Sequence, residues 1–239
     1  CKAEGVKPII GCEVYVTPQG RTRFDKVHEL DAESRHLVLL CENEEGYRNL
    51  SYLVSMGWTE GFYIKPRIDL ELLRQYSGGL IALSACLAGE IPRRLRNGEY
   101  ENAKAYALEL SHIFGPDRFY LELQDHGIRD QAIVNQGILR IHRETGLPMV
   151  CTNDAHYLRK EDAEAHDVLL CIQTGKTIDD ENRMRYEPRN FYLRSEEEMA
   201  ALFAGYEGAL ENTSKIADMC NLDFSFGKYH LPEFQLPEG

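Results

Sequence analysis

The sequence predicts a domain of the α/β class. Apolar runs of strand length, such as Leu37–Cys41 and Leu80–Ser84, alternate along the chain with stretches of helical pattern. A junction also occurs twice in which a glycine ends a helix, a proline soon after prevents its continuation, and an apolar run follows. Strands that alternate with helices are typical of parallel βαβ units, whose strands are buried on both faces. This pattern fits an open doubly wound sheet and a closed barrel equally well.

The two junctions locate the first and last predicted strands. EGVKPII (residues 4–10) precedes a strand at Pro8–Ile10, and TGLPMV (residues 145–150) precedes one at Met149–Val150. Only four residues precede the glycine of the first junction, so we expect the chain to begin at the end of a helix whose start lies upstream. The other predicted strands are Leu37–Cys41, Leu80–Ser84 and Phe119–Leu123, and the predicted helices are Glu45–Ser55, Leu70–Tyr76, Tyr100–Phe114, Asp130–Glu144 and Glu161–Ile172.

The last quarter of the chain differs in character. Residues 177–190 are charged and rich in turn formers, and helices are predicted at Glu196–Phe203 and Tyr206–Cys220. The tail LPEFQLPEG contains two prolines and is predicted to be a linker toward a C-terminal neighbour. We therefore divide the chain into an α/β unit at 1–176 and an extension at 177–239.

Composition excludes several classes of protein. The 239 residues carry a net charge of −12, which makes the domain as a whole a poor non-specific binder of nucleic acid. Seven cysteines occur singly without a CxxC pair, which indicates no disulfide framework or zinc ribbon and favours a reducing, cytoplasmic setting. No run of about 18 apolar residues predicts a membrane span. The arginines at 93, 94 and 96 form a basic cluster that we interpret as a solvated face.

Polar side chains gather at the ends of predicted strands, where parallel α/β domains carry their functional groups. Asp154 and His156 follow the strand at Met149–Val150 and would point to the same face of an extended backbone. Together with Glu13 and Cys86 at two other strand ends, they predict a mixed site for Zn, Mn or Fe. No GxGxxG, P-loop or GxSxG motif occurs, so no nucleotide cofactor is predicted.

Each of these residues also has a purely structural interpretation. Asp154 could cap a helix or a turn while His156 is polar surface, and Cys86 could be a small core residue. His36, at the N-terminal side of Leu37–Cys41, could be a polar residue at a strand edge. The convergence on strand ends favours a metal site over these alternatives. The other histidines are interpreted as surface or satisfied core groups: His28, His112, His126, His142, His166 and His230.

Five segments resemble, in order, successive motifs of one family. They are KPIIGCEVY (7–15), HLVLL (36–40), LSACLAGE (83–90), TNDAHY (152–157) and FYLRSEEEM (191–199). The family is the PHP (polymerase and histidinol phosphatase) domain of bacterial replicative DNA polymerase III alpha subunits of the DnaE type. The resemblance extends over nearly the whole chain.

This resemblance implies a distorted seven-stranded (β/α) barrel over 1–176, with a helical extension and linker toward the polymerase core over 177–239. The barrel would be incomplete, because the first strands and the family's first ligands, including a His-x-His pair, belong upstream of Cys1. Five residues match family metal ligands: Glu13, His36, Cys86, Asp154 and His156. Asp154 and His156 would be catalytic, with Asp154 as the metal bridge, and about two to three divalent ions would bind in the intact domain.

The implied function is that of a part of a replicative DNA-directed DNA polymerase. Its metal cluster would serve 3′–5′ exonuclease proofreading or structural support, with DNA and other replicase subunits as partners. The polymerase's own catalytic aspartates would lie beyond Gly239, so the isolated segment is expected to be inactive. One alternative is a metal-dependent phosphoesterase acting on a small phosphate ester. Another is a non-catalytic module that braces the polymerase or docks a subunit.

Overall fold

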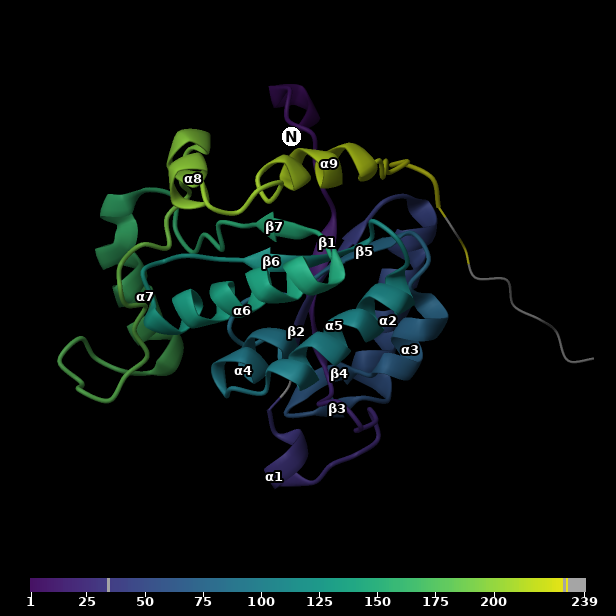
Figure 1. The fold of residues 1–239 in the computed structure, drawn as a ribbon, viewed down its shortest axis with the longest axis horizontal. Helices are drawn as coiled ribbons and strands as arrows, with labels where there is room; N and C mark the ends of the chain where they lie inside the picture. Colours follow the sequence, from purple (N-terminus) through teal and green to yellow (C-terminus); the bar gives the residue numbers. More distant parts are fainter. Residues whose placement is uncertain (34, 230, 232–239) are drawn as a thin grey trace, which may run out of the picture.

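The computed structural model describes residues 1–33, 35–229 and 231. These residues form an α/β domain around one sheet of seven strands in the order β3-β4-β1-β2-β5-β6-β7 (Figure 1). The predicted α/β class and barrel-like arrangement are confirmed, and within the described residues the sheet is not closed, since its edge strands β3 and β7 do not pair with each other. The strands are β1 (Gly11–Val16), β2 (Arg35–Cys41), β3 (Phe62–Tyr63), β4 (Lys65–Ile68), β5 (Leu80–Leu83), β6 (Phe119–Leu123) and β7 (Met149–Cys151).

The helices surround this sheet on several sides (Figure 1). They are α1 (His28–Asp31), α2 (Glu44–Thr59), α3 (Leu70–Tyr76), α4 (Glu90–Arg96), α5 (Tyr100–Phe114), α6 (Arg129–Thr145), α7 (Ala163–Thr174), α8 (Glu196–Leu202) and α9 (Glu211–Met219), with short 3-10 helices at Lys2–Glu4 and Lys160–Asp162. Helices α3 and α5 and strand β6 have the predicted bounds. The predicted helix Tyr206–Cys220 is wrong in its first turn and a half, because turns that include Gly208 at φ +77° precede α9.

Two strands of the sheet, β2 and the short edge strand β3, run against the predicted parallel pattern. Strand β2 is antiparallel to both of its neighbours, β1 and β5, whereas β5, β6 and β7 are parallel to one another and β1 is parallel to β4. The expectation of uniformly parallel βαβ units is therefore wrong at β2 and at β3, which pairs antiparallel with β4. As a result, the N-terminal end of β2 lies at the same edge of the sheet as the C-terminal ends of β1 and β5.

The first strand begins later than predicted. The run Pro8–Ile10 precedes the strand, and β1 starts at Gly11, opposite Leu40 of β2. Proline cannot donate a ladder hydrogen bond, and a side chain at Gly11 would meet the carbonyl oxygen of Leu39 at 2.5 Å. The ladder therefore starts at the residue that allows the close approach of β2, which places Glu13 inside β1 rather than beyond its end.

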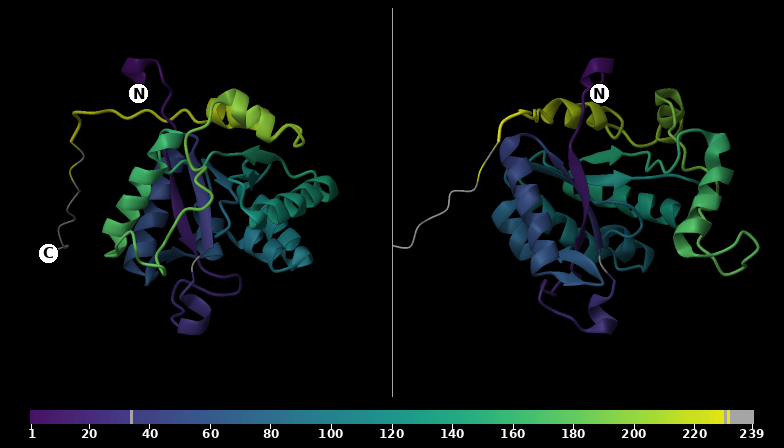
Figure 2. Two further views of the ribbon diagram at one scale, coloured as in Figure 1. Left: turned by 90° about the vertical axis from the view of Figure 1, so that its left-hand side faces the viewer. Right: turned by 180° about the vertical axis from the view of Figure 1, so that it is seen from behind.

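The two faces of the sheet are covered differently. In β2, Leu37, Leu39 and Cys41 are buried in the main core beneath the layer of helices, while the alternate residues are only partly buried. Strands β5 and β6 are buried on both faces, as predicted for a parallel sheet. Seen from behind, β1 crosses in front of the helical layer, with α9 at the top of the view and α7 at its right (Figure 2).

The last described helices pack onto the sheet. Met199 of α8 and the adjacent Phe203 belong to the main hydrophobic core, and Ile216 of α9 joins a second cluster with Tyr120 and Val150. The predicted division at residue 176 stays a prediction. Apart from Leu231, the predicted linker LPEFQLPEG lies outside the described residues, as does His230. Among the described residues, every helix is too short or too polar to cross a lipid bilayer.

Candidate metal centre

Three side chains, from β1, β2 and the loop that follows β5, meet near the point where β1 and β5 end and β2 begins. The ligand atoms of Glu13, His36 and Cys86 all lie within 4.8 Å of one another. His36 Nδ1 lies 2.9 Å from Glu13 Oε1 and 3.7 Å from Cys86 Sγ. Carboxylate, imidazole and thiol groups are the donors that first-row divalent metals take from proteins, so this group is a possible metal site.

The reversed direction of β2 explains why His36 belongs to this group. His36 is the second residue of β2 and pairs with Tyr15 of β1, which lies two residues from Glu13 and on the same face. Because β2 is antiparallel to β5, the start of β2 lies beside the end of β5, which Cys86 follows. A histidine at the beginning of its strand is thus brought to the carboxyl ends of its neighbours.

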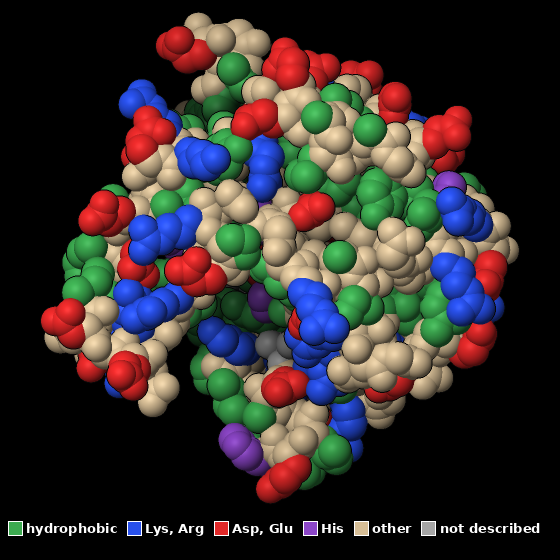
Figure 3. Space-filling model, turned by 60° about the vertical axis from the view of Figure 1, so that its left-hand side comes forward, with side chains coloured by type: hydrophobic (Ala, Val, Ile, Leu, Met, Phe, Trp, Pro, Cys, Tyr) green, Lys and Arg blue, Asp and Glu red, His purple; other side chains and the backbone are tan. Residues whose placement is uncertain are grey.

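Asp154 and His156 line the same cavity, which has a volume of about 330 Å³. Asp154 Oδ1 lies 3.6 Å from His156 Nε2, and the pair lies outside the tight group of three. The prediction that extended backbone aligns these side chains is wrong, because Asp154 has φ +42° and belongs to the irregular segment after β7. Figure 3 shows a hollow in this face of the molecule with a histidine side chain inside it. All five residues predicted as metal ligands therefore line one cavity.

Charges in the cavity act strongly on one another. The contact with the Cys86 thiol and the ion pair with Glu13 raise the pKa of His36 to about 10. The interaction with His156 lowers the pKa of Asp154, against the opposing effect of its burial. The carboxylate and thiol groups that stabilise a protonated imidazole also attract a divalent cation. Such a cation displaces protons from its ligands when it binds. The donor set therefore fits a divalent metal.

Residues 183–191 cover part of the cavity, a position that the residue pattern of this segment did not indicate. Tyr186 and Phe191 line it, and the ring centroids of Tyr186 and His156 are 4.5 Å apart. The carbonyl oxygen of Phe191 accepts a hydrogen bond of 2.8 Å from the backbone N–H of His156. An ion pair between Arg183 and Asp167 of α7 holds this segment in place. Its turn-rich composition predicted a loop but gave no sign of this position.

The residue pattern also did not indicate the role of Glu122, a buried carboxylate near Cys86. Glu122 Oε2 accepts a hydrogen bond of 2.9 Å from the backbone N–H of Ala85, and Oε1 accepts bonds from the hydroxyl of Thr152 (2.5 Å) and from Gln124 (3.1 Å). Burial raises the pKa of Glu122. This side chain joins the turn after β5 to the residue after β7. The one signal in the sequence is a charged residue within the otherwise apolar run FYLEL.

Two further histidines lie near the cavity. His126 is buried, with its Nε2 2.9 Å from the carbonyl oxygen of Asn153 and its Nδ1 2.9 Å from the amide of Gln131, which confirms its interpretation as a satisfied core group. His166 of α7 was interpreted as helix surface. Its ring instead packs against Tyr186 with a centroid distance of 5.1 Å, so it supports the segment that covers the cavity.

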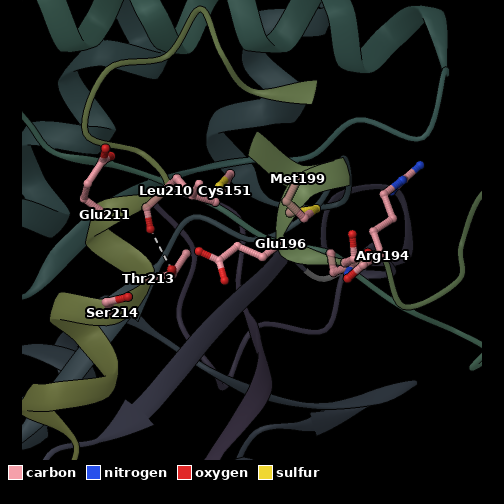
Figure 4. Close-up of a pocket in the computed structure, with 10 residues that line it drawn as sticks. Cys151, Arg194, Glu196, Met199, Leu210, Glu211, Thr213 and Ser214 are labelled. Atoms are coloured by element: carbon pink, nitrogen blue, oxygen red, sulfur yellow. Dashed lines mark hydrogen bonds between the residues drawn. The ribbon is translucent and has the colours of Figure 1, made fainter. Parts of the chain in front are cut away.

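A larger cavity of about 560 Å³ lies on the other side of the segment after β7, between α8 and α9 (Figure 4). Glu196, Glu211, Thr213 and Ser214 face it, and the hydroxyl of Thr213 donates a hydrogen bond of 2.6 Å to the carbonyl oxygen of Leu210. None of the described residues that line it is a histidine, and its one cysteine, Cys151, is buried. The five candidate ligands therefore make the smaller cavity the better candidate for chemistry.

Comparison with known proteins agrees with the resemblance. The PHP domain family matches residues 1–126. The chain is 47% identical over 238 residues to the DNA polymerase III subunit alpha of Borreliella burgdorferi, 44% identical over 238 residues to that of Treponema pallidum and 46% identical over 243 residues to that of Thermus aquaticus. In each case the match covers 99% of this chain and 20% of the relative. The chain thus spans about one fifth of the length of these curated relatives.

Proposed function

This chain belongs to the PHP domain family, and from that premise we propose that its cavity is a divalent-metal site for 3′–5′ exonuclease proofreading within a replicative DNA polymerase alpha subunit. The partners would be DNA and the other subunits of a cytoplasmic replicase. The observation that carries the proposal is the convergence of Glu13, His36 and Cys86 within 4.8 Å, in one cavity with Asp154 and His156.

The proposed ligands are those five residues, whose mixed nitrogen, oxygen and sulfur donors admit Zn, Mn or Fe. Divalent ions held there would act as Lewis acids toward a phosphodiester and make water a stronger nucleophile near neutral pH. Asp154 has two carboxylate oxygens and interacts electrostatically with both His156 and His36, so it is the best candidate to contact two ions. The lowered pKa of Asp154 keeps it ionised and ready to bind a cation.

The surrounding residues hold these ligands in position. The backbone of Phe191 fixes that of His156, and the Tyr186 ring packs against its imidazole. Tyr186 also lines the cavity itself. Glu122 supports the turn that carries Cys86 through the N–H of Ala85.

The proposal is tested with Asp154→Asn in the full-length alpha subunit. This substitution keeps the shape of the side chain but removes its charge. We expect excision of a mismatched primer end to fall by more than about 100-fold, because loss of an outer-shell partner of a metal ligand alone typically costs 10–100-fold. Polymerisation should be unchanged, and elemental analysis should find fewer divalent ions per chain than the two to three expected for the parent protein.

Asp218→Asn on α9 is the matched control, since this exposed carboxylate lies outside the residues that line the cavity. It should change neither excision nor metal content. A parent protein without bound divalent metal would contradict the site. Loss of metal from Asp154→Asn without any loss of excision would instead favour the structural alternative, in which the metal only braces the polymerase.

A further inference from the structure

A second hollow adjoins the candidate metal cavity. It has a volume of about 470 Å³ and shares a wall with the metal cavity, because Leu87 and Ala88 line both. Three of its lining residues carry accessible positive charge: Lys65, Arg93 and Arg96. We call this hollow the basic groove. Figure 3 shows lysine and arginine side chains on the rim of the hollowed face.

This concentration of cations contrasts with the protein's net charge of −12. Lys65 is exposed, and its ammonium group lies 5.4 Å from the centroid of the Tyr15 ring. Arg93 lies 3.2 Å from Glu33, whose side chain is 71% exposed, and Arg96 lies 3.9 Å from Asp130. Exposed ion pairs of this kind are weak, so these guanidinium groups can exchange their partners for another anion.

The third arginine of the cluster serves a different purpose. Arg94 donates a hydrogen bond of 2.7 Å to the buried carboxylate of Glu90, which also accepts one from Arg35. Arg94 is therefore part of the packing of α4. The interpretation of the whole cluster as a solvated face is wrong for Arg94, while Arg93 and Arg96 both face the groove.

An apolar side chain stands beside these cations. Ile64, at the tip of the β3–β4 hairpin, lines the groove and is 51% exposed. Its φ is +64°, a conformation that β-branched residues rarely adopt and that is often found at functional sites. Single-stranded nucleic acids are bound by grooves that combine positive charge for the backbone with side chains, most often aromatic, that pack against the bases.

We propose that the basic groove binds the sugar-phosphate backbone of single-stranded DNA and leads its end into the metal cavity. Lys65, Arg93 and Arg96 would contact successive phosphates, and Ile64 would contact a sugar or base. The inference rests on the proposed exonuclease function for the identity of the substrate. It adds the path by which that substrate arrives, which is formed by residues outside the candidate ligand set.

Photo-crosslinking in the full-length alpha subunit tests this path. A benzophenone amino acid replaces Ile64, and Asp154→Asn is included with a metal chelator present, so that binding is measured without excision. We expect a labelled single-stranded oligonucleotide to crosslink at position 64. The same photo-reactive residue at Leu108, which is exposed on α5, should not capture the oligonucleotide.

Substitution of all three cations by glutamine should then raise the oligonucleotide concentration needed for half-maximal crosslinking. It should also reduce the slope of log affinity against log salt by about 2, at roughly 0.7 per phosphate contact on a single strand. Arg48→Gln removes one positive charge from the exposed face of α2, outside the groove, and should leave both values unchanged.

Each result separates the two proposals. Crosslinking at position 64 that depends on the three cations supports the groove even if Asp154→Asn leaves excision intact, in which case only the exonuclease proposal fails. No capture of the oligonucleotide at position 64, or capture only of another segment of the polymerase chain, would overturn the groove as a DNA path. Capture that persists unchanged after removal of the three cations would overturn it as well.

Discussion

At the scale of single residues, Glu122 shows how much depends on one buried carboxylate. Its two oxygens accept three hydrogen bonds, and one donor, the backbone N–H of Ala85, cannot rotate away. Ala85 itself has φ +63°, so the turn before Cys86 is held in a conformation that is uncommon for a residue with a side chain. The geometry around Cys86 therefore depends on a residue from the adjacent strand.

We expect Glu122→Leu to destabilise the protein by about 1–3 kcal/mol for each buried donor that it leaves unpaired. Glu122→Gln should have a smaller effect, because its amide oxygen can still accept one of the bonds and Gln124 has an unpaired side-chain oxygen that can accept from the new amide. Urea unfolding measures both variants. Equal stability of Glu122→Leu and the parent protein would show that the hydrogen bonds have no net effect.

Asp31 gives a prediction for the dependence of stability on pH. Its buried carboxylate accepts two hydrogen bonds from Arg21 and one from the backbone of Val27, and the bond with Arg21 is the main reason that the pKa of Asp31 falls to about 2. A lowered folded-state pKa stabilises the fold at pH values above the unfolded pKa near 3.8. That stabilisation decreases as the pH falls from about 4 and is lost below about 2.

Asp31→Asn should therefore destabilise the protein near neutral pH by roughly 1–3 kcal/mol, the usual cost of an impaired buried hydrogen bond. The difference from the parent protein should shrink as the pH falls from 4 toward 2. Denaturant unfolding at a series of pH values measures it. A difference that stays constant over this range would mean that ionisation of Asp31 does not contribute to stability.

At the scale of the elements, the sheet and its helices meet at close backbone contacts. The first turn of α2 approaches the loop before β5 so closely that a Cβ at Gly46 would lie 1.8 Å from the carbonyl oxygen of Gly79. Backbone atoms cannot rotate away as the end of a flexible side chain can. The position of α2 on the sheet therefore requires glycine at this residue.

We expect Gly46→Ala to cost roughly 1–3 kcal/mol in the free energy of unfolding, as overpacking usually does, or more where backbone must move. Gly205→Ala is the control, because open space surrounds Gly205 and its φ is not positive. Thermal unfolding should show a lower midpoint for Gly46→Ala alone. Unchanged midpoints for both variants would show that α2 can shift on the sheet without cost.

Direction is the property of an element that the residue pattern describes least well. The run HLVLL has the same apolar character in either direction, so β2 could be predicted as a strand without any indication that it runs against β1 and β5. That direction decides whether His36 lies near Cys86 or at the opposite edge of the sheet. The site therefore depends on contacts between distant segments, such as that between His36 and Cys86, which are 50 residues apart along the chain.

At the scale of the whole molecule, the last described helices contribute to the same fold as the sheet. Ile216 of α9 is 3% exposed and packs in a cluster with Tyr120 and Val150. Ile216→Ala should lower the free energy of unfolding by about 2–5 kcal/mol, through lost burial and the cavity that remains. Ile172→Ala, at a position that is 72% exposed, should have little effect.

Calorimetry of the two variants distinguishes the possible organisations. If residues 177–229 fold together with the sheet, Ile216→Ala shifts a single cooperative transition to lower temperature. A separate low-temperature transition that alone responds to Ile216→Ala would show instead that the extension unfolds independently, in line with the predicted division at residue 176.

The sequence by itself determined the α/β class and most of the strands and helices, while the full set of five candidate ligands came from its resemblance to a known family. The class and the elements depend on local patterns of apolar residues, and the ligand set depends on motifs that match those of the family. Only the tertiary structure decided the direction of β2, the start of β1 at Gly11, the cover that Tyr186 provides and the separation of Arg94 from the groove that Arg93 and Arg96 line. Each of these depends on contacts between distant segments, and no local pattern of residues specifies which segments will meet.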